Sequence, residues 1–338
     1  MFFRKILALI VMCVSFNSFS QVSWSTIFTP STGTLWDIQF VNDHIGYVHS
    51  SNGEVLKSED EGWTWEIVYP DNDDIILSMS FPDENHGWIC GWNDFFKFTD
   101  DGGASWNEVP FPEIGSGFVT EFDAVYFLDS LTGYVGVYDQ DISGYFDVYK
   151  TTDGGLTWTV TGWVTSIGFF ESIEFIDEDN GWIASWSSIL STSDGGDTWN
   201  VHFTGTGQSY QWIDAADSDN IYALTDSGEV WSADDATAFS DVQYLELDEA
   251  YFELEVLNNN FGFVVGNNGS LYHWDGTTWN AIVGVASGAL TGVHIESESS
   301  VWLCGSGGTV YRGQITPNDA EVDYFSLQDT ACHLNTYP

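Results

Sequence analysis

The stretch TTDGGLTW, residues 151–158, combines two hydroxyl side chains, an acid, paired glycines and a tryptophan, as a small catalytic cassette would. Close variants recur at residues 58–65, 99–106 and 192–199. An active site is rarely built four times in one chain, whereas a structural turn is copied with every repeat unit. The stretch therefore indicates a repeat architecture before it indicates any chemistry.

A second motif precedes each copy: an apolar residue, followed six positions later by glycine and an aromatic residue. It occurs in full from Phe40, Phe81, Phe127 and Phe175, and in weaker form from Ala215, Val256 and Ile295. The aromatic that closes each cassette recurs in steps of 41, 52, 41, 40 and 40 residues, at Trp65, Trp106, Trp158, Trp199, Phe239 and Trp279. The chain therefore contains seven repeats of about 40 residues.

Each repeat holds short β-rich runs separated by Asp, Asn and Gly turns, with no helical period. Repeats of this length with about four strands are typical of propeller blades. The sequence thus predicts an all-β, seven-bladed β-propeller over residues 21–313. The last repeat lacks an outer strand, and residues 22–28, which resemble residues 64–68, would supply it and close the ring.

The pattern Ser/Thr-x-Asp-x-Gly-x-Thr/Ser-Trp resembles the Asp-box (BNR repeat) of sialidase-type and sortilin-type propellers. With the Gly-aromatic motif and the lysines Lys57, Lys97 and Lys150 ahead of the boxes, residues 24–313 resemble the photosystem II stability/assembly factor-like propellers. The physical reading of the box is structural, since its acid can accept turn amides and its tryptophan can pack between blades. These structural residues are Asp60, Trp65, Asp101, Trp106, Asp153, Trp158, Asp194 and Trp199.

The first twenty residues have a basic start, an apolar run over residues 6–14 and small residues before Gln21. This is typical of a secretory signal peptide, and we expect a secreted, extracellular or cell-surface product, with the periplasm as an alternative. Residues 314–338 are expected to be a linker and the truncated start of a β-sandwich module. The propeller would then be a monomeric part of a longer multidomain protein.

Removal of the signal leaves four permanent cations, Lys57, Lys97, Lys150 and Arg312, against 51 acidic residues. So acidic a surface repels phosphate backbones and anionic head groups, which argues against nucleic-acid binding and against membrane insertion of the mature chain. Acidic loops could capture Ca²⁺, the histidines show no metal-ligand spacing, and no other cofactor is expected.

Strand parity places the boxes and the acidic first turns of the blades on one face, here the bottom face. The opposite, top face receives two insertions of blade three, near residues 111–121 and 138–147. It also receives an aromatic residue five positions after the motif glycine in three consecutive blades. The predicted ligand-binding residues are these aromatics and the acids beside them: Trp92, Asp94, Tyr138, Asp139, Asp141 and Trp186. Their rings could stack on sugars or hold an extended peptide, or they could merely cover blade edges.

These observations favour a secreted, non-catalytic binding propeller that holds a glycan or an extracellular protein through its top face. One arginine in the mature chain argues strongly against a sialidase, which needs an arginine cluster for its carboxylate substrate. The alternative is a glycoside hydrolase of the xyloglucanase-like Asp-box type, which needs only two carboxylates. A third hypothesis is a spacer within an adhesin. No catalytic residue is assigned.

Overall fold

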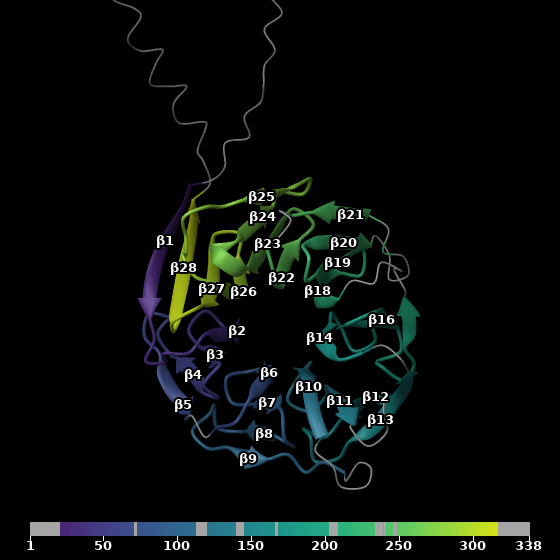
Figure 1. Ribbon diagram of the computed structural model, residues 1–338. Helices are drawn as coiled ribbons and strands as arrows, with labels where there is room; N and C mark the ends of the chain where they lie inside the picture. Colours follow the sequence, from purple (N-terminus) through teal and green to yellow (C-terminus); the bar gives the residue numbers. More distant parts are fainter. Residues whose placement is uncertain are drawn as a thin grey trace, which may run out of the picture.

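The computed structural model describes residues 21–70, 73–112, 120–139, 145–165, 168–202, 209–233, 239, 241–245 and 249–316. These residues form seven four-stranded antiparallel sheets arranged around a central axis (Figure 1). The helical content of the described ranges is one 3-10 turn, η1 (Asn267–Gly269). No helix in these ranges is long and apolar enough to cross a membrane. The prediction of an all-β, seven-bladed propeller is confirmed.

Blades one to six each run outward from an inner strand beside the axis, in chain order. Blades one to three are β2 (Leu35–Phe40), β3 (Gly46–Ser50), β4 (Val55–Ser58), β5 (Glu66–Tyr69); β6 (Ile76–Ser80), β7 (Gly87–Gly91), β8 (Phe96–Thr99), β9 (Asn107–Glu108); and β10 (Thr120–Phe127), β11 (Gly133–Asp139), β12 (Tyr145–Thr151), β13 (Thr159–Thr165). Blades four to six are β14 (Phe170–Phe175), β15 (Gly181–Ser185), β16 (Ile189–Thr192), β17 (Asn200–His202); β18 (Tyr210–Asp217), β19 (Asn220–Thr225), β20 (Glu229–Ala233), β21 (Asp241–Tyr244); and β22 (Tyr251–Asn258), β23 (Phe261–Gly266), β24 (Leu271–Trp274), β25 (Trp279–Ala281).

Blade seven joins the two ends of the described chain. Its inner strands are β26 (Leu290–Ser297), β27 (Ser300–Gly305) and β28 (Thr309–Thr316), and its outer strand is β1 (Gln21–Phe28). β1 pairs antiparallel with β28 over its whole length, from Gln21 opposite Thr316 to Phe28 opposite Thr309. The purple β1 and yellow β28 lie side by side in Figure 1. The predicted closure of the ring by the N-terminal strand is therefore confirmed.

The blades are held together by stacked aromatic rings. The ring of Trp88, in blade two, lies flat on that of Phe127, in blade three, with 3.4 Å between centroids. Trp158, the last residue of the box in blade three, meets the same phenylalanine edge-on at 6.0 Å. Gly133 must be glycine because a Cβ there would lie 2.5 Å from the Phe127 ring. The same arrangement recurs at Tyr47–Phe81–Trp106, Tyr134–Phe175–Trp199 and Trp302–Phe40–Trp65.

Within each box the acid ties the turn. Asp153 accepts hydrogen bonds from the amide of Thr157 at 2.9 Å and from its hydroxyl at 2.7 Å. The Thr151 hydroxyl donates to Asp153 and accepts from the amide of Gly155, both at 2.9 Å. The bonds from Thr157 hold the pKa of Asp153 below its usual range. The same four hydrogen bonds recur in the boxes of Asp60, Asp101 and Asp194, where the glycine amide again donates to the first hydroxyl of the box.

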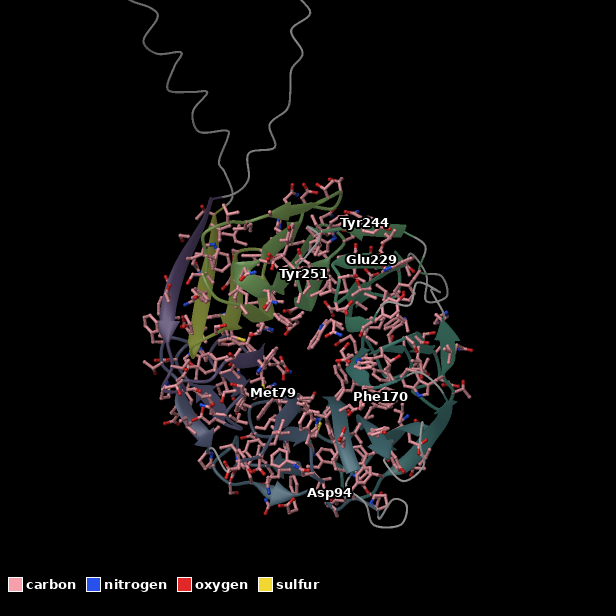
Figure 2. All side chains as sticks on the ribbon, in the orientation of Figure 1. Met79, Asp94, Phe170, Glu229, Tyr244 and Tyr251 are labelled. Carbon is pink, nitrogen blue, oxygen red and sulfur yellow. The ribbon has the colours of Figure 1, made fainter. Side chains whose placement is uncertain are left out.

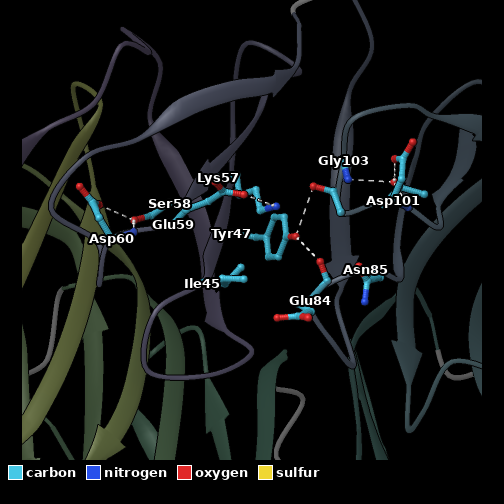
Figure 3. Close-up of polar contacts among 12 residues, drawn as sticks. Ile45, Tyr47, Lys57, Ser58, Glu59, Asp60, Glu84, Asn85, Asp101 and Gly103 are labelled. Atoms are coloured by element: carbon cyan, nitrogen blue, oxygen red, sulfur yellow. Dashed lines mark hydrogen bonds and ion pairs between the residues drawn. The ribbon is translucent and has the colours of Figure 1, made fainter.

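The boxes lie on the same face as the first turns of the blades, as strand parity requires. The amide of Gly154 donates to the carbonyl of Leu131 in the first turn of its own blade. Figure 3 shows the contact between neighbouring blades on this face: the Tyr47 hydroxyl of blade one reaches the carbonyls of Glu84 and Gly102 in blade two, at 3.1 and 3.4 Å. The residues of the bottom face thus hold the turns and the blades together.

Candidate functional site

All four permanent cations of the described chain take part in contacts that stabilise blades. Lys57 pairs with Glu59 at 2.8 Å beside the Tyr47 ring, and Lys97 pairs with Glu108. The ammonium of Lys150 donates to the carbonyl of Gly195 in the next blade at 2.5 Å. Arg312 lies between the rings of Trp63 and Trp302, at 5.2 and 4.9 Å, and 3.9 Å from Glu61. None of these cations forms a patch for an anionic partner.

A cavity of about 740 Å³ occupies the axis of the ring and touches the inner strand of every blade. Trp92 and Ser51, from second turns on the top face, line one end of it, and Pro82 and Leu128, beside first turns, line the other. Figure 2 shows side chains of the inner strands extending into the central opening. Its aromatic wall includes Trp36, Trp92, Tyr126, Trp212 and Phe252, and its carboxylates are Asp37, Glu171, Glu174 and Glu253.

Polar residues line the axis because each inner strand is the edge of its sheet. An edge strand leaves N–H groups that the sheet does not pair. Side chains of the preceding blade accept several of them: Asp214 accepts from Val256 at 2.6 Å, and Ser80 accepts from Phe127 at 2.8 Å. Gln39, Ser172 and Glu255 do the same for Phe81, Ile213 and Ile295. The polar lining therefore links each blade to the next.

The cavity holds carboxylates without a compensating cation. Neither lysine nor arginine occurs among the described residues that line it. Burial raises the pKa of Asp37 and that of Glu171 to about 7. The pKa of Glu253 is raised well above its usual range, by burial and then by the charges of Asp37 and Glu255. Burial also lowers the pKa of His49, on the cavity wall, to about 3, so this imidazole is neutral.

The predicted aromatic residues fall into two groups. Trp92 is 44 % exposed and lines the cavity. Trp186 is 54 % exposed, and Phe169 lies between it and Tyr138, with ring centroids 5.2 and 5.1 Å away. Burial raises the pKa of Glu171 and the nearby Trp186 side chain lowers it, so this row reaches the cavity wall. Tyr138 lies within β11 rather than in a loop, half-buried and paired with Phe146.

The structure does not place the predicted acidic residues at the cavity. Asp94 is exposed, has a φ of +60° and lies away from the central opening in Figure 2. Asp139 is the last residue of β11, and its side chain and the whole of Asp141 lie outside the described part of the chain. The same holds for residues 113–119 and 140–144, within the two insertions of blade three.

Sequence reasoning missed the cavity residues Asp37, Glu171, Glu174 and Glu253. The sequence nevertheless carried a signal for the lining. The residue before the apolar residue that opens each glycine-aromatic motif is never aliphatic: Gln39, Ser80, Tyr126, Glu174, Asp214, Glu255 and His294. A non-aliphatic residue at one position of every inner strand marks the side that faces the axis. Trp36 and Phe252 occupy equivalent positions in blades one and six, but the other five blades carry no aromatic residue there, and Trp212 has no aromatic equivalent in any blade. The repeat pattern therefore did not mark this wall.

The comparisons with known proteins agree with this architecture. The family model for the photosynthesis system II assembly factor YCF48 matches residues 16–162. The photosystem II assembly lipoprotein Ycf48 of Synechococcus sp. (strain CC9902) is 24 % identical over 181 residues, 49 % of this chain and 51 % of that relative. A xyloglucanase of Paenibacillus sp. is 28 % identical over 206 residues, 51 % of this chain and 20 % of the enzyme. The chain thus spans about half the length of the first relative and a fifth of the second.

Among solved structures, YCF48 bound to D1 peptide superposes with a TM-score of 0.70 at 20 % identity, covering 87 % of this chain and 97 % of that one. YCF48 from Cyanidioschyzon merolae superposes with a TM-score of 0.69 at 18 % identity, covering 86 % and 98 %. At such identities the superpositions show the fold alone. The repeated boxes, the family model and these superpositions support an Asp-box propeller of the BNR-repeat type that is similar to Ycf48.

Proposed function

We propose that this protein is a non-catalytic binding propeller that holds an extended segment of a partner protein on its top face, over the mouth of the central cavity. The observation that carries the proposal is the cavity itself, whose top end lies beside the exposed ring of Trp92. Exposed aromatic rings beside a concave site are typical of ligand binding. A solved structure of similar fold is YCF48 bound to D1 peptide. We further propose that the chain is exported and is a monomer within a longer protein.

The charge of this protein's surface indicates the charge of the partner segment. The four permanent cations of the described chain hold blades together, and the remaining charge is acidic. An acidic surface attracts basic partners and repels acidic ones, and its charge does not oppose neutral ones. The proposed segment is therefore apolar or basic.

A library of random displayed dodecapeptides, panned on the immobilised mature chain, tests this function. Peptides are expected to be retained, and Trp92→Ala is expected to weaken their binding by about tenfold, because it removes an exposed ring at the cavity mouth. Tyr244→Ala is the matched control, since Tyr244 is 63 % exposed and lies on the outer strand β21 near the rim of Figure 2. Equal retention by both variants would contradict the proposed site.

Cleavage or binding of a polysaccharide is the second candidate, favoured by the similarity to a xyloglucanase. Burial raises the pKa of Asp123 to about 8 and that of Glu171 to about 7, and a carboxyl protonated near neutral pH can act as a general acid. The mature chain should be incubated with a polysaccharide panel, with and without Ca²⁺, while retention and product size are recorded. Shortened products would establish the enzyme, and retention without cleavage would establish a glycan-binding module.

A further inference from the structure

The cavity walls combine two chemical groups that attract the same kind of ligand. Carboxylates come from β2, β14 and β22, and aromatic rings come from β2, β10, β18, β22 and the turn after β7. Carboxylates bind cations through charge-assisted hydrogen bonds. The faces of tryptophan and phenylalanine attract cations through the ring quadrupole, most strongly where water is excluded. Both groups therefore favour a ligand with positive charge.

No lysine or arginine among the described residues that line the cavity supplies this positive charge. The ionisable groups around the axis come from every blade: Asp37, His49, Cys90, Asp123, Glu171, Glu174, Asp214, Glu253, Glu255, His294 and Cys304. Burial lowers the pKa of His294 to about 4, so it is neutral beside Glu255 and supplies no charge at neutral pH. A cation that entered would stabilise the charged carboxylates and release the protons they hold.

His49 provides an independent indication of a ligand. It lies on β3, is 2 % exposed and lines the cavity. Its Nδ1 has no hydrogen-bond partner among the described residues. A buried polar atom without a partner is costly, and a neutral imidazole can accept an N–H. An ammonium or guanidinium group in the cavity would supply that donor.

The size and opening of the cavity fit a side chain that enters from the top face. Its volume of about 740 Å³ lies within the range of sites that enclose small ligands. Its top end is lined by Trp92, where the proposed partner segment would lie. We infer that the central cavity is a receptor for one lysine or arginine side chain of that segment, an inference that rests on the proposed function.

Blocked pentapeptides that differ at one position test this inference. The probes are acetyl-Ala-Ala-X-Ala-Ala-amide with arginine, lysine, citrulline or norleucine at X, titrated calorimetrically into the full mature chain near neutral pH. The arginine and lysine peptides are expected to bind at least about tenfold more tightly than their neutral counterparts. Binding of the charged peptides should release protons, measured as a dependence of the enthalpy on the buffer, and citrulline should release none.

Two variants distinguish the cavity from general surface charge. Glu253→Gln removes one carboxylate of the wall but keeps an oxygen that can accept from the Val293 amide, 3.3 Å away. It is expected to weaken the arginine peptide by about tenfold and to leave the citrulline peptide unchanged. Glu298→Gln makes the same substitution at an exposed site on the first turn of blade seven. Equal effects of the two variants would overturn the inference.

The remaining outcomes separate this inference from the function on which it rests. Equal binding of all four peptides would support a peptide-binding propeller and overturn the cation receptor. Absence of binding by any peptide at millimolar concentration would also overturn the receptor, while the displayed library decides the broader function. If Glu253→Gln fails to fold, the wild-type protein still decides the test, because the charged peptides should release protons on binding and citrulline should release none.

Discussion

At the scale of single residues, Phe127 shows how a motif position becomes a stabilising contact. It is 3 % exposed and contacts one tryptophan ring from the preceding blade and one from its own box. Because side chains in such a seam are close-packed, the neighbouring rings cannot move in to fill a missing one.

Phe127→Ala is expected to lower the free energy of unfolding by about 3–5 kcal/mol, since it removes buried area and leaves a cavity between two blades. Urea denaturation monitored by tryptophan fluorescence would measure it. Leu131→Ala is the control, because Leu131 is 57 % exposed and should change stability by less than about 0.5 kcal/mol. Similar losses in the two variants would show that the aromatic seam does not hold the blades.

Asp153→Ala tests whether the box acid has a structural role. It removes the acceptor for both the amide and the hydroxyl of Thr157, so the melting temperature should fall by a few degrees. Asp153→Asn keeps one acceptor and should fall less. Thr152→Ala, at an exposed position of the same turn, should leave the melt unchanged. A melt insensitive to Asp153→Ala would leave the box without its proposed role.

At the scale of elements, the outer strand of blade seven is the only outer strand in the described chain that comes from the other end of the sequence. β1 covers β28, and Ile27 is 8 % exposed within it. β1 completes the ring, and the closed ring buries the seam between blades seven and one. In that seam Trp302 stacks on Phe40 with 4.7 Å between ring centroids.

Deletion of residues 22–28 is expected to lower the melting temperature by about 10 °C or more, because β28 loses its partner along its length. Replacement of the same residues by a Gly/Ser segment of equal length is the comparison that separates strand pairing from chain length. Both changes should destabilise the protein to a similar extent. A melt that stays where it was would mean that the ring holds without this strand.

At the scale of the whole molecule, the repeat pattern predicted much of the fold and little of the site. Boxes and glycine-aromatic motifs recur at fixed spacing, so blade number, ring closure and the seam residues could be read from one chain. The cavity could not be read in the same way, because Asp37 and Glu253 occupy the same position of their inner strands while the other blades carry no acid there, and closure of the ring brings the two together. Trp92 was identified from its position after β7. That it lies at the cavity could not be predicted from one sequence, because this depends on the curvature of the ring.

The pH dependence of stability also belongs to the whole ring. Burial raises the folded-state pKa of Asp37 to about 7, of Asp214 to about 6 and of Asp123 to about 8, above the unfolded value of 3.8. The folded state therefore binds more protons, and its stability should increase as the pH falls from about 8 to about 5. The box acids, whose pKa is lowered, should reverse this trend below about pH 4, where they become protonated.

Urea denaturation across this pH range would show a maximum on the acidic side of neutrality. Asp214→Asn should flatten the rise because it removes one of the groups that titrate in the ring while keeping an acceptor for Val256. Asp217→Asn, at an exposed turn position, should preserve it. A stability that declines steadily from pH 8 downward would show that the buried carboxylates are already charged and stabilised.

The pairing of Gln21 with Thr316 also has a consequence for the order of folding. Contacts between residues so far apart form slowly, since nearly the whole chain must be placed before they can be made. Blades one to six can assemble in turn as the chain emerges, but blade seven waits for its last strand. Until then the molecule is an open ring with unpaired edges at both ends, and such edges are where chaperones or a second copy of the chain would bind.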